Sequence, residues 1–235
     1  MRKVTWLFLA LAILYSGYWL IASRTSERGV TAWFDARAAQ GWQSDYATLE
    51  THGYPLNLET TLTDIAMADP ATGLAYQTSR VSITSRSFTP TRLHANLAQD
   101  ARLSTPFQHI DFVNKSAKGT LFVEVGSALT MHRATFDLEG LTATSTLGWG
   151  FSLDSATASA VRHEDNRLAH DVSVSIANLA PSASMMAQLN PNGILSDSFD
   201  AMTIDASVTF DKDWDITALE GPRPQPTHVL LRNMT

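Results

Sequence analysis

The sequence predicts a mainly β protein. It has an N-terminal transmembrane helix and a short juxtamembrane helix, followed by a long antiparallel, twisted, one-sided sheet or meander. Three observations support this. An uncharged apolar run begins near the N-terminus. From about Trp42 onward, apolar and polar residues alternate, which is the period of a strand with one solvated face. Turn-forming residues separate the alternating runs, so successive strands are expected to pair with each other.

The first predicted element covers residues 1–24. The uncharged run Val4–Ser23 has about the ~20 residues that cross a hydrocarbon core as a helix. It is longer than the apolar region of roughly 7–15 residues in a cleaved secretory signal. We therefore expect an uncleaved signal anchor in preference to a cleaved signal. The aromatic residues of the run suit a membrane interface and lie near its two ends: Trp6, Tyr15, Tyr18 and Trp19.

Positive charges lie on both sides of this run. Arg2 and Lys3 precede it, whereas Arg24, Arg28 and Arg37 follow it. We expect the N-terminus to stay in the cytoplasm and the C-terminal bulk to be exported, partly because an anchor near the start of a chain commonly takes this orientation. The predicted location is thus the inner membrane, crossed once, with residues 42–235 in the periplasm.

Residues 25–41 predict the juxtamembrane helix. Mostly apolar and aromatic residues, with one arginine, follow helical spacing until Gly41: Val30, Trp33, Phe34, Arg37 and Ala38. This stripe is expected to pack on the following sheet, with lipid headgroups as the alternative.

Residues 42–235 predict one antiparallel β domain, with a C-terminally incomplete sheet as the alternative to a complete one. Strands are expected in Leu56–Thr63, Leu74–Ile83, Ala134–Leu138, Val172–Ile176 and Ile204–Phe210, and around Leu153. Turns are expected at Asp69–Gly73 and Asn190–Gly193, a helical interruption at Ser182–Leu189, and an extended connector or edge at Gly221–Pro226. The inward faces predict core burial of Leu58, Leu62, Val81, Ile83, Val174, Ile176, Val208 and Phe210.

Composition excludes several classes of protein. Hydrophobic residues make up 44% of the chain and charged residues only 17%, with a net charge of -6. The chain has no lysine or arginine cluster, so no nucleic-acid partner is expected. It also has no cysteine, which excludes disulfides, thiolate metal sites and cysteine nucleophiles.

The densest group of chemically versatile side chains is His163-Glu164-Asp165 with His170-Asp171. Such residues suit zinc or calcium, but their spacing matches no known motif, and a solvated turn between strands explains them better. Gly148-Trp149-Gly150 is interpreted as a bend. Asp211, Asp213 and Asp215 around Trp214 are interpreted as a turn, with cation binding as the alternative. Five other histidines are scattered: His52, His94, His109, His132 and His228. We assign no catalytic, cofactor-binding or metal-binding residue and expect no cofactor and no enzymatic activity.

Four segments carry a resemblance to a known family. They are Ala39-Gln40-Gly41, Leu49-Glu50-Thr51-His52-Gly53-Tyr54-Pro55-Leu56, Ala68-Asp69-Pro70-Ala71-Thr72-Gly73 and Ile204-Asp205-Ala206-Ser207-Val208-Thr209-Phe210. Together with the anchor, they resemble the domain of unknown function 2125 family of alphaproteobacterial membrane-anchored envelope proteins. The motif Gly53-Tyr54-Pro55-Leu56, leading into a strand, is the most specific, although Leu56 replaces the family's more usual aromatic residue. The resemblance implies no reaction. More distantly, the order of features is similar to AsmA-type envelope proteins, which implies lipid traffic or envelope homeostasis.

These observations favour a non-enzymatic envelope protein whose apolar sheet face contacts lipid or another envelope component. The alternative is an assembly or scaffold factor that binds a protein through a strand edge. A hydrolase that uses residues 163–171 is a third and weaker hypothesis. A long sheet must cover its apolar face with a second layer, a helix or lipid, and the sequence leaves that choice open.

Overall fold

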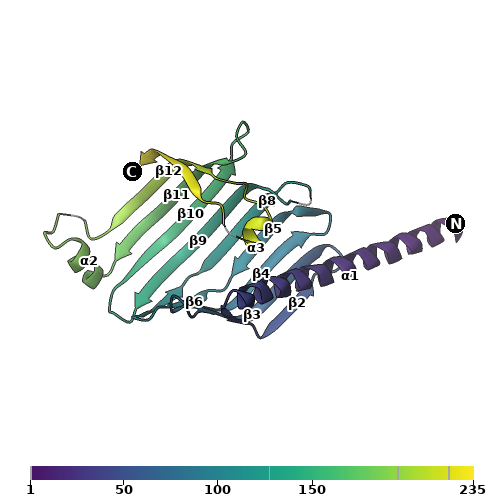
Figure 1. The fold of residues 1–235 in the computed structure, drawn as a ribbon, viewed down its shortest axis with the longest axis horizontal. Coiled ribbons are helices and arrows are strands. Elements are labelled where there is room, and N and C mark those ends of the chain that lie inside the picture. The colour runs from purple at the N-terminus through teal and green to yellow at the C-terminus, as the bar shows by residue number, and fades with distance from the viewer. Residues whose placement is uncertain (1, 127, 195, 222) are drawn as a thin grey trace.

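The computed structural model describes residues 2–126, 128–194, 196–221 and 223–235 (Figure 1). Its helices are α1 (Arg2–Ala39), α2 (Ala183–Leu189) and α3 (Thr217–Glu220). Its strands are β1 (Gln43–Asp45), β2 (Thr48–His52), β3 (Asn57–Asp69), β4 (Leu74–Arg86), β5 (Thr89–Leu97), β6 (Asp100–Ser104), β7 (His109–Val113), β8 (Ser116–Val123), β9 (Met131–Ser145), β10 (Gly150–Arg162), β11 (Ala169–Pro181), β12 (Phe199–Phe210) and β13 (Pro226–Met234). A mainly β protein with an N-terminal apolar helix is therefore confirmed.

The two helical segments expected near the N-terminus form one continuous helix. α1 runs through the expected junction near Arg24 without a break and ends at Ala39, before Gly41 at φ +90°. Its N-terminal half projects away from the sheet and is long and apolar enough to cross a membrane, as either an anchor or a signal sequence would be (Figure 1). Met1, the first residue of the expected anchor, lies outside the described residues.

All the described strands belong to one antiparallel sheet. Its main order is β1-β3-β4-β5-β8-β9-β10-β11-β12-β13, with β2 beside β3 and with β6 and β7 bridging β4 and β9. The hairpin turn expected at Asp69–Gly73 is present: Asp69 accepts hydrogen bonds from Ala71 N and Thr72 Oγ1, and Gly73 has φ +71°. The expected helical interruption is α2, whose Ser182 side chain accepts a bond from Met185 N. Of the expected Gly221–Pro226 connector, Pro222 lies outside the described residues, and Pro226 begins the edge strand β13.

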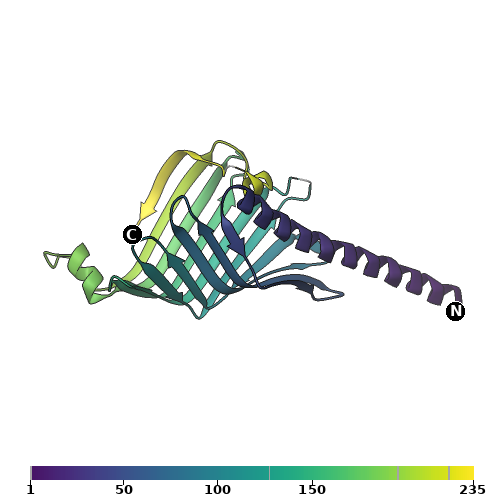
Figure 2. The ribbon, with the colours of Figure 1, turned by 60° about the horizontal axis from the view of Figure 1, so that its bottom comes forward.

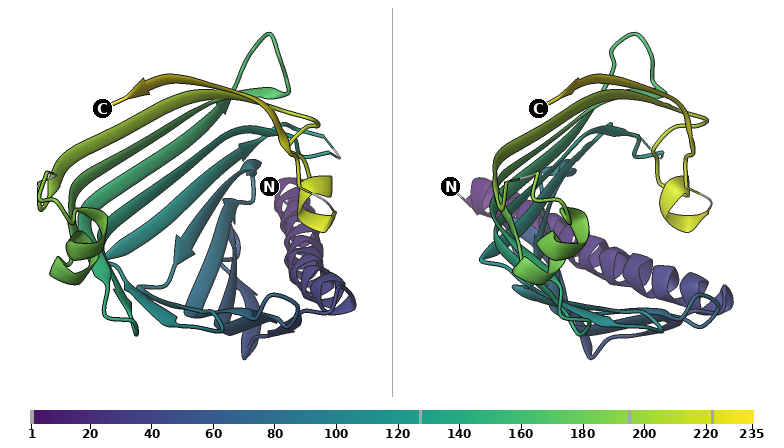
Figure 3. Two further views of the ribbon diagram at one scale, coloured as in Figure 1. Left: turned by 60° about the vertical axis from the view of Figure 1, so that its left-hand side comes forward. Right: turned by 90° about the vertical axis from the view of Figure 1, so that its left-hand side faces the viewer.

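The sheet is strongly curved, as Figures 2 and 3 show. β12 and β13 form one limb of the curve, and β2, β3 and β4 form the other (Figure 3). The C-terminal half of α1 lies on the concave side, and α3 lies against α1. The two helices thus approach each other across the open side of the sheet.

The hydrophobic core is small and lies where α1 meets the sheet. Phe34 of α1 packs with Leu62 and Ile65 of β3, and each of the three is less than 9% exposed. Trp33 and Val81 pack around them. The helical stripe predicted in residues 25–41 therefore does pack on the sheet.

The predicted core list needs correction. Leu62 is buried, but Ile83 is 38% exposed, and the other six residues are only partly buried. The alternation of these residues was predicted correctly, because their side chains lie on the same face of the sheet. The expectation of burial was wrong because, among the described residues, no second layer of sheet covers that face.

Candidate functional site

The two faces of the sheet differ completely in chemistry. Because directly paired residues of antiparallel strands share a face, the pairing register lists each row of side chains. One row on the face that contacts α1 is Leu62, Val81, Leu97, Ala117, Leu138, Ala156, Ile176 and Met202. The next is Thr60, Ile83, Ala95, Gly119, Phe136, Ala158, Val174, Ile204 and Met234. We call this surface the concave face, since α1 packs on it from inside the curve.

The opposite, convex face is polar throughout the corresponding row. That row is Glu59, Thr84, His94, Thr120, Thr135, Ser159, Ser173, Asp205 and Asn233. It is the face expected to meet solvent. The single polar residue in the two concave rows, Thr60, is held by Ser26 of α1 and by Thr51, at 2.8 and 3.0 Å between hydroxyl oxygens.

The middle of the concave face carries small side chains. β10 contributes Ala156, Ala158 and Ala160, and β8 contributes Ala117 and Gly119. A methyl group added at Gly119 would lie 3.7 Å from Ala95 Cβ, an ordinary contact. β9, which lies between β8 and β10, carries the larger Phe136 and Leu138 on this face. Larger side chains also line β11 and β12: Val172, Val174, Ile176, Met202 and Ile204. The concave face is therefore low along β8 and along β10, and higher along β9, β11 and β12.

α1 joins this face to the membrane-spanning candidate through an aromatic cluster. Trp19 Nε1 donates to Asn57 O at 2.9 Å, and the Trp19 ring lies edge-on to Tyr54 at 5.4 Å between centroids. Tyr15 stacks on Phe88 at 5.6 Å and donates its hydroxyl to Pro55 O. Tyr54 and Phe88 remain 53% and 68% exposed. The Gly53–Leu56 motif is recognisable from the sequence only as a strand start, because its contact with Tyr15 depends on the tertiary fold.

The side chains of the His163–Asp171 group do not all converge, because β11 places His170 and Asp171 on opposite faces of the sheet. His163 Nε2 lies 2.9 Å from Asp171 Oδ1, which also pairs with Arg232 at 2.8 Å. The hydrogen bond from His163 is the main reason that the pKa of Asp171 lies below its ordinary value. His170, the next residue, points to the other face because side chains alternate along a strand. Across the described residues, no group of three His, Cys, Asp or Glu side chains could hold a metal ion.

His170 instead belongs to a buried polar group at the end of the concave face. Its side chain is 1% exposed and neither ring nitrogen has a hydrogen-bond partner among the described residues. Arg162 Nη1 and Asp213 Oδ1 are likewise buried and unpaired at those atoms. Burial is the main cause that lowers the pKa of His170. Buried polar atoms without protein partners are positions where water commonly binds.

The other segments singled out in the sequence have structural roles. Gly148 has φ +84° in the turn between β9 and β10, and Trp149 Nε1 donates to Gln108 Oε1 at 2.9 Å. Asp213 pairs with Arg167 at 2.8 Å, and Asp215 accepts a bond from Thr217 N at 2.9 Å. These contacts fit the turn interpretation of residues 211–215.

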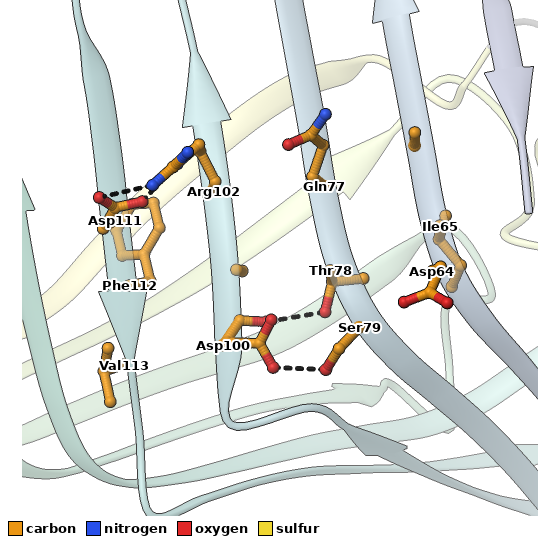
Figure 4. Close-up of a pocket in the computed structure, with 12 residues that line it drawn as sticks. Asp64, Ile65, Gln77, Thr78, Ser79, Asp100, Arg102, Asp111, Phe112 and Val113 are labelled. Carbon is orange, nitrogen blue, oxygen red and sulfur yellow. Dashed lines mark hydrogen bonds and ion pairs between the residues drawn. The ribbon is translucent and has the colours of Figure 1, made fainter.

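A pocket of about 620 Å³ lies between β3, β4, β6 and β7 (Figure 4). Arg102 binds Asp111 through two hydrogen bonds of 2.6 and 3.1 Å, which lower the pKa of Asp111. Asp100 accepts a bond from Thr78 at its backbone oxygen, at 2.8 Å, and another from Ser79 at its carboxylate. Arg102 and Asp111 thus engage each other as a structural ion pair, and Asp100 is held by neighbouring hydroxyl groups.

The fold and this face define a class: a mainly β protein with one long apolar helix and a single curved sheet, whose concave face is apolar and whose convex face is polar. The chain belongs to the family described as "Uncharacterized protein conserved in bacteria (DUF2125)", whose model matches residues 19–235. Neither the comparison with curated proteins nor the comparison with solved structures found a match.

Proposed function

We propose that this protein is a non-enzymatic, membrane-anchored protein of the bacterial cell envelope whose concave face binds the acyl chains of membrane lipids. The observation that carries the proposal is the concave face itself. It is apolar across the sheet, from β3 to β12, and among the described residues α1 packs on its β3 side. Exposed apolar surface of this extent is unfavourable in water and is typical of a binding surface.

The connection to α1 favours lipid as the occupant. The helix that packs on the concave face continues, without a break, into a segment able to cross a bilayer. Membrane lipid is therefore present next to this face whenever α1 is inserted. The small side chains along β8 and β10 leave room above the sheet that a chain of methylene groups can fill, at about 0.8 kcal/mol for each CH₂ removed from water.

The location follows from the same helix. Arg2 and Lys3 lie before the apolar run and Arg24, Arg28 and Arg37 lie after it, so the positive charges do not decide the orientation. The N-terminal end is placed in the cytoplasm because an anchor near the start of a chain commonly takes that orientation. The proposed arrangement is a single pass through the inner membrane, with the sheet in the periplasm and a role in lipid handling or envelope homeostasis. The distant similarity to AsmA-type envelope proteins agrees with this role but is an analogy of fold only.

Native mass spectrometry of the full chain, released gently from membranes, tests lipid binding directly. Ala158 and Ser159 are neighbours on β10 with side chains on opposite faces. A carboxylate introduced by Ala158→Glu lies among acyl chains, where an unpaired charge is strongly disfavoured. We expect Ala158→Glu to lose the lipid adduct and Ser159→Glu to keep it. A lipid-free wild-type chain, or equal adducts on both variants, would contradict the proposal.

A second candidate function is protein binding through β13. All nine residues of this edge strand are exposed, including Val229, Leu230 and Leu231 at 54–60%. An exposed edge of this kind pairs readily with another chain. Photo-crosslinking in cells from position 230 tests this candidate: a specific protein adduct supports it, whereas lipid adducts alone favour the first proposal.

A further inference from the structure

Two exposed apolar turns lie beside the part of α1 that is expected to be in the bilayer. Residues Gly53–Leu56 connect β2 to β3, and Ser87–Phe88 connect β4 to β5. Neither turn contains a charged residue. Tyr54, Leu56 and Phe88 are 53%, 60% and 68% exposed, so their apolar surface is not used within the described part of the chain. We call these two turns the aromatic edge.

Contacts with α1 fix the level of the aromatic edge along the helix. Ser16 Oγ and Tyr54 Oη lie 2.7 Å apart, and Tyr15 stacks on Phe88. Tyr18 donates to Ser87 O at 3.3 Å, and Trp19 donates to Asn57 O at 2.9 Å. The edge therefore lies at the level of residues 15–19 of α1.

This level lies within the apolar run, on the N-terminal side of the charged residue that follows the run. Arg24 is the first charged residue after the run, nine residues beyond Tyr15 and five beyond Trp19. At a rise of about 1.5 Å per residue, the edge lies roughly 7–13 Å deeper than Arg24 along the helix axis. If the bilayer surface is instead placed at Tyr18, the apolar run Val4–Tyr18 is too short to cross a hydrocarbon core of about 30 Å. With the surface at Arg24 or at Tyr18, the aromatic edge at the level of residues 15–19 meets the bilayer.

The chemistry of the aromatic edge suits an interface. Tyrosine and tryptophan prefer the headgroup level, where the ring is apolar and its polar atom is hydrogen-bonded. Arg86 comes directly before the second turn, and Arg92 lies on β5, four residues after Phe88. Both side chains suit lipid phosphates. Leu58 of the concave face lies on β3, which begins after the first turn, and Ile83 lies on β4, which ends at the second turn.

We propose that the aromatic edge, Gly53–Leu56 with Ser87–Phe88, inserts into the leaflet on the sheet's side of the membrane and docks the membrane-proximal end of the concave face onto the bilayer. Lipid then reaches the concave face without crossing water. This inference rests on the proposed function, because it needs α1 to be inserted, and it adds the surface at which lipid gains access.

The absence of cysteine from the chain makes a clean depth measurement possible. Single-cysteine variants Phe88→Cys and Leu56→Cys of the full chain carry an environment-sensitive fluorophore in vesicles of phosphatidylethanolamine and phosphatidylglycerol. Phe107→Cys is the matched control, because Phe107 is an 85% exposed phenylalanine in the turn between β6 and β7. Leu9→Cys reports insertion of α1 itself.

We expect quenching of the Phe88 and Leu56 labels by nitroxide-bearing lipid to exceed quenching by aqueous iodide several-fold, with the reverse order for Phe107. If the Leu9 label is in lipid but the Phe88 and Leu56 labels respond like Phe107, the inference is overturned while the anchor stands. Shielding of the edge labels from both quenchers also overturns it, since protein would then cover the edge. If the Leu9 label is not in lipid, the proposed anchor itself fails.

Discussion

Gly140 lies in the middle of β9 with φ +59°, a conformation that residues with a Cβ rarely adopt. A Cβ there would also approach Lys115 Cγ and Cδ to 2.7 Å, although that side chain can move. Asp64 in β3 and Asn178 in β11 have the same kind of backbone, at φ 50° and 52°. Asp and Asn are the non-glycine residues that tolerate it best, because their short polar side chains bond locally. Asn178 Nδ2 indeed donates to Asp154 Oδ2 at 2.7 Å.

Gly140→Ala is expected to destabilise the protein by about 1 kcal/mol, since a left-handed residue with a Cβ carries that order of strain. Gly119→Ala is the control, because its added methyl meets only ordinary contacts. Urea unfolding of the solubilised chain measures both. Equal midpoints for the two variants would show that the backbone of Gly140 is not constrained.

His170 predicts a pH dependence of stability. Burial holds its folded-state pKa below the ordinary value of 6.5, so the folded state keeps the ring neutral while the unfolded chain takes up a proton. The free energy of unfolding therefore falls as the pH drops below about 6.5 and levels off below the folded-state pKa. His170→Phe should remove this part of the profile, whereas His228→Phe, at an exposed position, should keep it. Unfolding midpoints between pH 7.5 and 5 provide the measurement, and an unchanged profile in His170→Phe would contradict it.

At the scale of elements, α1 is held to the sheet by few side chains. Phe34 is 8% exposed and lies edge-on to Trp33 and Tyr46, at 5.2 and 4.9 Å between centroids. Its ring makes the buried apolar contact between the helix and β3, in addition to the hydrogen bonds of Trp19 with Asn57 and of Ser26 with Thr60.

Phe34→Ala should lower the free energy of unfolding by about 3 kcal/mol, the low end for removal of a buried phenylalanine. It should also make the peptide bonds after Arg28 and Arg37 more accessible to trypsin, since the helix is no longer held. Phe107→Ala removes the same ring from an exposed turn and should change neither. Loss of stability without faster cleavage would mean that Phe34 does not hold α1 in place.

The strands also contain a feature that strict alternation does not predict. Leu62 and Ile65 contact the same residue of α1 although they are three positions apart on β3, on either side of Asp64. Apolar residues show the same spacing around Gly140, at Leu138 and Leu141, and around Asn178, at Ile176 and Leu179. Register is kept between β9, β10 and β11 through this region. Neighbouring strands therefore change the alternation of their side chains at the same level of the sheet. For this reason, a repeat of two residues does not describe a whole strand.

At the scale of the whole molecule, a single curved layer leaves its apolar face uncovered by the described residues beyond the part that α1 contacts. A ligand that binds only the folded state stabilises it in proportion to its occupancy. If acyl chains bind the concave face, removal of lipid should lower the melting temperature, and added phospholipid should restore it. Ala158→Glu should melt at the same temperature with and without lipid, whereas Ser159→Glu should respond like the wild type. A melting temperature that is independent of lipid would contradict acyl-chain binding.

Much of the fold was predictable from local patterns. Alternation located β3, β4, β11 and β12, and the Asp69–Gly73 turn located a hairpin. The short strands between Thr89 and Val123 were missed because each pairs with a partner distant in the sequence, and their alternation is brief. The aromatic edge was also missed, since Tyr15 and Phe88 are 73 positions apart and meet only in the tertiary structure.

The sequence by itself determined the apolar helix, the strand faces and the absence of a recognisable catalytic motif, because these depend on residue type and short-range periodicity. Only the tertiary structure decided that α1 is continuous from the candidate membrane-spanning segment to the sheet, and that α1 packs on the β3 side of the concave face. Long-range contacts set the curvature, the register between distant strands and the packing of Phe34. Residue type and short-range periodicity do not specify such contacts. The apolar face was thus readable from the sequence, but its exposure was not.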